Sequence, residues 1–270
     1  MDTVLRPLNP QDLAFAHSLS LLAGWNQTRI DWARFLALAP GACLLAEASD
    51  MPAGTATTTS YGSDLAWIGM VLVSPDFRRR GIGTALLEAA IRHLREERGV
   101  ACIRLDATPE GQPLYEGLGF EAEWTLRRWV REPGQDSRSN PSPPLPLGPL
   151  QLSLDRAVFG ADRSELLASL IAGSFAGESL PDGSFGLMRE GERAAYLGPI
   201  TAAGAGSGIM IADRLVATCP QDRTIFWDLP DSNLAAIGLA ERLGFAPVRI
   251  LTRMRLGDAP AKCDPPRMFG

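Results

Sequence analysis

The sequence predicts an α/β protein built from two similar halves in tandem, and three observations support this. Residues 65–73 are apolar without alternation, which is typical of a strand covered on both faces, and a glycine-containing turn and an amphipathic helix follow. Residues 132–149 are rich in Pro, Ser and Gly and lack apolar periodicity, as in a linker. Beyond them lies a weaker copy of the first half. A chain of 270 residues is long enough for two ordinary domains.

Composition and charge exclude several classes of protein. The net charge of −5 argues against a nucleic-acid partner, and no apolar run approaches the ~20 residues of a membrane helix. The first residues lack the features of a signal peptide, so we expect a cytoplasmic protein. The two histidines have no metal-ligand spacing, and no metal site is expected. Four widely spaced cysteines indicate reduced, mostly buried thiols: Cys43, Cys102, Cys219 and Cys263.

The elements before the central strand can be assigned from local patterns. Residues 4–8 favour an edge strand, and Asn9 with Pro10 favours a helix start, with the helix running to about Ala23. Residues 24–28 interrupt this helix, and Asp31 is expected to cap a second helix that ends at Leu38. Two further strands are expected at residues 42–48 and 54–60, joined by a turn at residues 49–52.

The helix after the central strand begins within the glycine pair Gly81 and Gly83. Its first N–H groups have no intrahelical partner and carry the positive end of the helix dipole, which favours binding of a phosphate. Glycine allows backbone to approach an anion closely, and Arg78, Arg79 and Arg80 add positive charge at the same place.

Three interpretations of this stretch were weighed. The glycines could simply turn the chain. A dinucleotide site would require three glycines and an acidic residue about 20 positions on, whereas only two glycines are present. The third interpretation is coenzyme A. Arg-x-x-Gly-x-Gly at residues 78–83, followed by Tyr-x-x-x-Gly-Phe at residues 115–120, resembles the GNAT superfamily of acyl-CoA N-acyltransferases.

The resemblance extends over nearly the full chain. The chain as a whole is similar to tandem bacterial GNAT proteins with a degenerate C-terminal copy. It implies two GNAT-like domains, each a mixed, mostly antiparallel sheet flanked by helices. The expected boundaries are 1–131 for a catalytic domain, 132–149 for the linker and 150–270 for the degenerate domain with its tail. The tail from Pro260 either lies back over the domain interface or is a frayed end.

The implied function is N-acetyl transfer from acetyl-CoA, as co-substrate, directly to a primary amine, with a small molecule as the expected acceptor. Protein lysine acetylation and a non-catalytic acyl-CoA sensor are the alternatives. The sequence predicts no oligomeric state.

The resemblance also implies roles for individual residues. A bulge frees a backbone N–H at Leu72 or Val73 to polarise the thioester, with Val71 beside the pantetheine arm. Tyr115 is the expected acid for the leaving thiolate. The expected cofactor-binding residues are Val71, Leu72, Val73, Arg78, Arg79, Arg80, Gly81, Ile82, Gly83, Thr84 and, at a position where the family often has Asn, Thr108.

On the acceptor side, Trp25 and Asn26 are substrate-contact candidates, although Trp25 could equally be a core anchor. Glu47 and Asp106 lie on strands near the cleft, but no general base is assigned.

The second half lacks most of the residues that the resemblance assigns to cofactor binding and to proton donation. If Gly204 and Gly206 correspond to Gly81 and Gly83, Thr201 takes the place of Arg78 and Ala240 that of Tyr115. Asn233 stands at the position equivalent to Thr108, so the sequence leaves open a weak cofactor site in the second half. We expect the second half to be catalytically silent and to shape the acceptor pocket.

Overall fold

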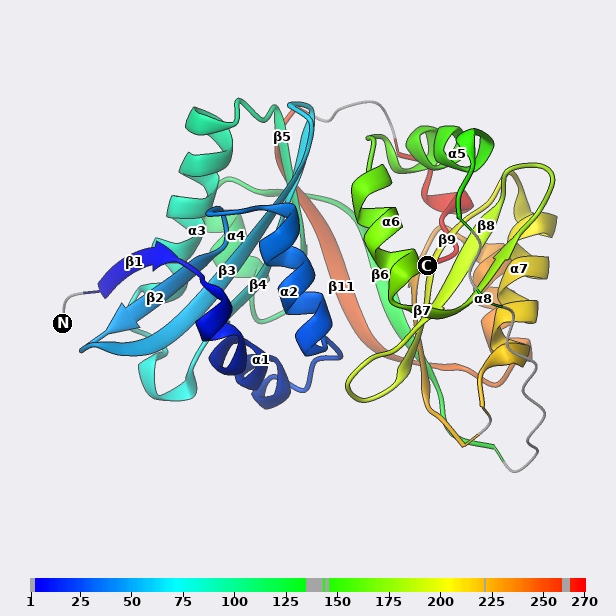
Figure 1. The fold of residues 1–270 in the computed structure, drawn as a ribbon, viewed down its shortest axis with the longest axis horizontal. Coiled ribbons are helices and arrows are strands. Elements are labelled where there is room, and N and C mark those ends of the chain that lie inside the picture. Colours follow the sequence, from blue (N-terminus) through cyan, green and yellow to red (C-terminus); the bar gives the residue numbers. More distant parts are fainter. Residues whose placement is uncertain (1–2, 135–142, 144–145, 221, 259–262) are drawn as a thin grey trace. The chain divides into compact units, whose positions relative to one another are not determined.

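The computed structural model describes residues 3–134, 143, 146–220, 222–258 and 263–270. The chain forms two compact units, drawn in Figure 1. Unit 1 consists of Met1–Ala122 and Met254–Pro260, and unit 2 consists of Glu123–Arg253 and Ala261–Gly270.

Unit 1 has one mixed sheet with helices on both faces. The strands lie in the order β1-β2-β3-β4-β5, followed by the end of β11, and all named pairs among β1–β5 are antiparallel except β4–β5, which is parallel. The elements are β1 (Thr3–Pro7), α1 (Leu13–Leu22), α2 (Arg29–Leu38), β2 (Leu44–Ala48), β3 (Met51–Tyr61), β4 (Leu65–Val73), α3 (Ile82–Arg92), β5 (Cys102–Ala107) and α4 (Gln112–Gly117).

Alternation along β2 shows how the faces of this sheet are covered. Leu45 packs in the cluster with Leu19 of α1 and Trp32 of α2, whereas its neighbour Ala46 packs with Ile82 and Leu86 of α3. Successive strand residues point to opposite faces, so α1 and α2 cover one face and α3 covers the other (Figure 1). The central strand is therefore buried on both sides, as its unbroken apolar run predicts.

Unit 2 repeats this plan. Its strands lie in the order β11-β6-β10-β9-β8-β7, and the β9–β10 pair is parallel like β4–β5. The elements are β6 (Glu121–Arg131), α5 (Pro149–Phe159), α6 (Ser164–Ala172), β7 (Ser174–Ser179), β8 (Phe185–Arg189), β9 (Ala195–Thr201), α7 (Ala205–Thr218), β10 (Ile225–Pro230), α8 (Leu234–Arg242) and β11 (Ala246–Gly257).

The compact units do not follow the predicted boundary at residue 131. From Leu126 to Arg131, β6 pairs antiparallel with β10, so this strand belongs to unit 2 instead of closing the first half. The end of β11 takes the corresponding place in unit 1, where Met254 is fully buried in one cluster with Phe120. Of the predicted linker, residues 135–142 and 144–145 lie outside the described residues.

Three local predictions need correction. Thr28 is the N-cap of α2, and Asp31 is the third helical residue, whose carboxylate accepts the Thr28 N–H at 2.8 Å. The sequence predicts a helix at residues 209–216 after a Gly-rich turn, whereas α7 begins at Ala205, so Gly206 and Gly208 lie inside it. No element was predicted from the sequence at α5, β7 or β11.

Within the described part of the chain, no helix is both long and apolar enough to cross a membrane. All four cysteines have free thiols, and Cys43, Cys102 and Cys219 are buried.

Candidate functional site

The candidate site of unit 1 lies where β4 and β5 separate. The two strands pair in parallel over only three positions, from Leu65 opposite Cys102 to Trp67 opposite Arg104. Beyond Trp67, β4 continues to Val73 and β5 continues to Ala107 without further pairing between them. The second half of β4 therefore presents a backbone edge that β5 does not cover.

A bulge in β4 sets which backbone groups face this open edge. Thr55 pairs with Leu72 and Thr57 with Gly69, so Met70 and Val71 together oppose one residue of β3. Met70 has a φ of 49°, and its carbonyl accepts the Thr55 hydroxyl at 2.9 Å. The predicted bulge is thus present, at Met70 and Val71.

Register distinguishes Val73 from Leu72, the two residues predicted to supply the thioester donor. The Ser74 N–H donates to the Ala53 carbonyl at 2.8 Å, and hydrogen bonding alternates along an antiparallel pair. Leu72 therefore faces β3 with its N–H, while the N–H and carbonyl of Val73 face the open edge. The Arg78 Nε donates to this Val73 carbonyl at 3.1 Å, which also brings the arginine to the end of β4.

The α3 N-terminus stands next to this edge. Its N-cap Gly81 has a φ of 78°, a left-handed conformation that only glycine adopts without strain. Arg78, Arg79 and Arg80 are exposed just before it, and Arg80 donates to the Asp76 carbonyl at 2.8 Å. Ile82 is buried against the sheet, so toward a ligand it offers its backbone N–H, as do Gly83 and Thr84 in the same turn.

At Gly83, α3 meets both β4 and α4. A Cβ placed at Gly83 would lie 3.8 Å from Cγ2 of Val73 and 3.7 Å from Cδ2 of Leu114, the residue before Tyr115. The segments carrying the three predicted groups, namely the Val73 N–H, the first turn of α3 and the Tyr115 phenol, are therefore neighbours.

Tyr115 has an unused hydroxyl. Its ring packs edge-on against Phe120 with centroids 6.1 Å apart, and among the described residues the phenol has no hydrogen-bond partner. Burial raises the pKa of Tyr115 to about 12, so the phenol stays protonated at neutral pH. A neutral, unengaged phenol can donate a proton to a leaving thiolate.

Thr108 is used by the protein's own backbone. Its hydroxyl accepts the Gly111 N–H at 3.2 Å, and its carbonyl accepts the Gln112 N–H at 2.9 Å. These bonds shape the turn that opens α4. They explain a polar residue at this position without a ligand, so its contact with the cofactor stays a prediction.

The segment between α1 and α2 holds the predicted acceptor residues. Trp25 packs partly buried against the cluster of α1 and α2, and Asn26 is buried. Next to them, Oε1 of Gln27 is buried without a hydrogen-bond partner among the described residues. A buried acceptor without a partner is unfavourable in the free protein, and no sequence motif marks Gln27.

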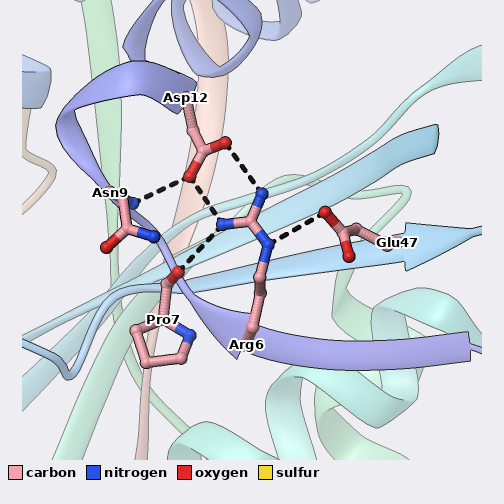
Figure 2. A network of polar contacts seen from close by, with 5 residues as sticks. All are labelled: Arg6, Pro7, Asn9, Asp12 and Glu47. Atoms are coloured by element: carbon pink, nitrogen blue, oxygen red, sulfur yellow. Dashed lines mark hydrogen bonds and ion pairs between the residues drawn. The ribbon is translucent and has the colours of Figure 1, made fainter. Parts of the chain in front are cut away.

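Of the two carboxylates considered as bases, Glu47 is engaged in an ion-pair network. Its Oε1 accepts a hydrogen bond from the Arg6 Nε at 2.9 Å. The Asp12 carboxylate accepts from Nη1 and Nη2 of the same guanidinium at 2.7 and 2.9 Å (Figure 2). The hydrogen bond from Arg6 lowers the pKa of Asp12. Glu47 is therefore a structural ion-pair partner, which weakens its candidacy as a base and leaves Asp106.

The corresponding positions of unit 2 are closed or occupied. Thr201 is buried and donates its hydroxyl to Asp155 at 2.7 Å, and Ala240 is fully buried. Asn233 caps α8 by accepting the Ala236 N–H at 3.0 Å and donates to the Met268 carbonyl at 2.9 Å. The Asn expected to mark a second cofactor site is thus bound within its own unit.

Comparison with known proteins agrees with this geometry. The acetyltransferase (GNAT) family profile matches residues 13–120, and an acetyltransferase (GNAT) domain profile matches residues 152–270. The chain belongs to the GNAT acetyltransferase family. It contains two such domains in tandem, as the motifs predict, and is an acyl-CoA N-acyltransferase by class.

Relatives with assigned names match either a part of the chain or most of it. An uncharacterized N-acetyltransferase, YitH, of Bacillus subtilis is 35% identical over 115 residues, which are 41% of this chain and 40% of that protein. The ribosomal protein bS18 alanine N-acetyltransferase of Escherichia coli is 44% identical over 68 residues, 24% of this chain and 45% of that protein. A holothin acyltransferase of a Pseudoalteromonas species is 23% identical over 94% of this chain and 88% of its own length. The chain thus spans less than half the length of the first two.

Among solved structures, a candidate acetyltransferase from Pyrococcus horikoshii superimposes with a TM-score of 0.81 at 26% identity. The superposition covers 99% of this chain and 93% of that one. The tandem arrangement of two units therefore also occurs in a solved relative.

Proposed function

We propose that this protein transfers an acetyl group from acetyl-CoA to a primary amine, using the residues of unit 1. The observation that carries the proposal is the open edge of β4: the Val73 N–H faces away from β3, and the helix N-terminus at Gly81 and Arg78 adjoins it. A backbone donor suited to an acyl carbonyl therefore lies next to donors suited to a diphosphate, which supports the proposal. Coenzyme A combines these two groups, and the unused Tyr115 phenol fits its thiol end.

In the proposed mechanism the amine attacks the thioester carbonyl directly. The Val73 N–H donates to the oxygen as negative charge develops there, a contribution typically worth ~10²–10³ in rate. Tyr115 donates its proton to the sulfur as the carbon–sulfur bond breaks, giving free coenzyme A and the amide. The amine must lose a proton to a base or to water, because an alkylammonium has a pKa of ~10.4.

A small-molecule acceptor is the first choice. The holothin acyltransferase, which is named for holothin, aligns with 94% of this chain, whereas the ribosomal protein acetyltransferase aligns with 24% of it. Trp25, Asn26 and the unpartnered Gln27 Oε1 are the groups that we assign to the acceptor side.

The test compares two variants at one backbone position. Val73→Pro removes the N–H that faces the open edge, whereas Val73→Ala shortens the side chain and keeps that N–H. We expect proline to be tolerated, since the missing donor is not part of the β3–β4 ladder. The measurement is steady-state release of free coenzyme A with a panel of amines, beside lysine peptides, for wild type and both variants.

The expected result is turnover on at least one amine and a further ~10²–10³-fold loss in Val73→Pro relative to Val73→Ala. Equal turnover in the two folded variants would remove Val73 from the mechanism. Turnover on lysine peptides alone would identify a protein acetyltransferase. Tight acetyl-CoA binding without turnover on any acceptor would identify a sensor.

A further inference from the structure

The last residues of the chain are built into unit 2. Phe269 is fully buried, its N–H donates to the Ile200 carbonyl at 2.9 Å, and the Ile200 N–H donates to the Gly270 carbonyl at 3.2 Å. The Ala202 N–H donates to the Arg267 carbonyl at 3.1 Å, and the Arg267 Nε donates to the Ala202 carbonyl at 3.0 Å. A frayed end is therefore the wrong interpretation of residues 264–270, which we call the C-terminal segment.

This segment lies along the edge of β9 that corresponds to the open edge of β4. The β9–β10 pair also ends after three positions, from Ala195 opposite Ile225 to Leu197 opposite Trp227. Ile200 lies beyond that point and pairs with Gly186 of β8 on its other side. Val73 in unit 1 similarly lies beyond the last β4–β5 pair and opposite Gly54 of β3. The same backbone edge is thus open in unit 1 and hydrogen-bonded to the C-terminal segment in unit 2.

Side chains hold the segment from several elements. The Trp227 indole of β10 donates to the Phe269 carbonyl, and Asn233 donates to the Met268 carbonyl at 2.9 Å. In α7 the Phe269 ring rests on Gly208, where a Cβ would come within 2.4–2.6 Å of the ring atoms. Gly208 is therefore required by Phe269, which explains a glycine inside this helix.

The first turn of α7 also carries an internal anion. Ser207 donates its hydroxyl to Asp182, and this hydrogen bond lowers the pKa of the Asp182 carboxyl. A carboxylate is thus held at the helix turn that corresponds to the α3 N-terminus in unit 1.

We infer that the slot between β9 and β10 is a binding site for an extended, amide-bearing chain, and that the C-terminal segment fills it as a substitute for the pantetheine arm of a coenzyme. The segment offers what such an arm offers: alternating amide groups for the strand edge and an apolar group for the interior. Unit 2 therefore binds no acyl-CoA while its own C-terminus is in place. The comparison with unit 1 rests on the proposed function, but the occupant of the slot can be tested without any coenzyme.

The first test uses two glycines of one helix. Gly208→Ala places a methyl group against the Phe269 ring, whereas Gly206→Ala, two residues earlier in α7, meets no atom within 4 Å. We expect Gly208→Ala to raise amide hydrogen exchange at Ile200 and Phe269 at least ~10-fold and to lower the melting temperature by several degrees. Gly206→Ala should leave both unchanged or slightly improved. Similar exchange in the two variants would overturn the inference.

The second test supplies the occupant in trans. A chain ending at Asp264 lacks residues 265–270 of the C-terminal segment. We expect this shortened chain to melt at lower temperature or to refold incompletely. Addition of the peptide Pro-Pro-Arg-Met-Phe-Gly should restore the melting temperature or the refolded yield, while the peptide with Ala in place of Phe should not. Equal rescue by both peptides, or by neither, would show that the slot does not recognise this segment.

Coenzyme titration completes the set. Wild type should bind at most one acetyl-CoA per chain, and Gly81→Asp, which alters unit 1 alone, should bind it on the order of 10-fold to 100-fold more weakly, with no second site. A site in Gly81→Asp with undiminished affinity, or a second site in wild type, would show that unit 2 accepts the coenzyme with its C-terminus in place, which contradicts the inference. Absence of acetyl-CoA binding to wild type would instead contradict the proposed function, and it would leave the exchange and peptide results valid.

Discussion

Units 1 and 2 share a parallel strand pair that separates after three positions, and they differ in what covers the exposed edge. In unit 1 the end of β4 keeps the Val73 N–H free of strand pairing, beside a left-handed Gly81 and an arginine. In unit 2 the end of β9 is bonded to the chain's own C-terminus. The two units thus share a scaffold but not an open strand edge. In our proposal, a coenzyme site requires that this edge be left open.

The phenols of the two units differ in the same sense. The Tyr115 hydroxyl has no partner among the described residues, whereas the Tyr196 hydroxyl donates to Asp228 at 2.9 Å. Asp228 also accepts two bonds from Arg128, at 2.8 and 2.7 Å. One tyrosine is available for chemistry, and the other completes a buried polar network.

The largest expected effect separates these two tyrosines. Tyr115→Phe removes the proposed acid, so turnover should fall by ~10²–10⁴-fold with little change in acetyl-CoA affinity. Tyr196→Phe should keep turnover and lower the free energy of unfolding by ~1 kcal/mol, because Asp228 loses a donor. Steady-state kinetics and urea unfolding of both variants check this. A matching loss of turnover in Tyr196→Phe would mean that unit 2 takes part in catalysis.

Removal of an ion-paired carboxylate should lower the free energy of unfolding much more in unit 2 than in unit 1. In unit 2, Asp155 is buried and accepts two bonds from Arg163, both at 2.8 Å. Asp155→Ala should lower the free energy of unfolding by ~3–5 kcal/mol, since a mostly buried guanidinium loses its carboxylate. In unit 1, Glu47→Ala should cost at most ~1 kcal/mol, because Glu47 is partly exposed and Arg6 keeps Asp12 (Figure 2). Chemical denaturation measures both, and equal losses would show that burial does not set the difference.

The helix N-caps give a third contrast. Gly81→Asp forces a side chain into the left-handed region, at ~1–2 kcal/mol, and adds a negative charge beside the diphosphate. Acetyl-CoA affinity should fall on the order of 10-fold to 100-fold. Gly204→Asp introduces the same residue at an N-cap with extended backbone and open space, where Asp is a favourable cap. Calorimetry should find unchanged affinity there, and a comparable loss would mean that unit 2 holds the coenzyme.

The smallest expected effect is a dependence of stability on alkaline pH. Burial raises the pKa of Tyr115 to about 12, above the ~10 of an unfolded tyrosine. Between these values the unfolded chain loses this proton and the native chain keeps it, so native stability falls as pH rises through this window. Tyr115→Phe should lessen that fall by ~1 kcal/mol between pH 9 and 11. Unfolding curves at pH 9, 10 and 11 measure it, and identical slopes in both proteins would contradict the burial of the phenol.

Local sequence patterns were sufficient for most elements of unit 1. The apolar run at residues 65–73 is β4, and the helix starts within the glycine pair, with Gly81 as its N-cap. These features depend on burial and on backbone conformation over a few neighbouring residues, which the residue types specify directly. The prediction at α2 placed the N-cap three residues late. Thr28 and Asp31 each bond through the side chain to the backbone N–H of the other, and both residue types are common N-caps.

The assignment of the strands to the units could not be predicted. Both β6 and β11 follow the same helix-Leu-Gly-Phe sequence, at Phe120 and at Phe245, and both pair along a sheet. Nothing in either strand's own pattern specifies which sheet it completes. That choice depends on long-range partners: β6 pairs with β10, and Met254 of β11 is buried in unit 1.

By itself, the sequence determined the family and the two tandem domains, and it predicted the diphosphate-binding turn, because each depends on motifs of a few adjacent residues. Only the tertiary structure decided that Val73 and not Leu72 faces the open edge, since one bulge in β4 sets that alternation. It also decided that Phe269 fills the equivalent edge of unit 2, far in sequence from Ile200 and Gly208. A strand edge is open or closed according to distant segments, and no local pattern encodes their position.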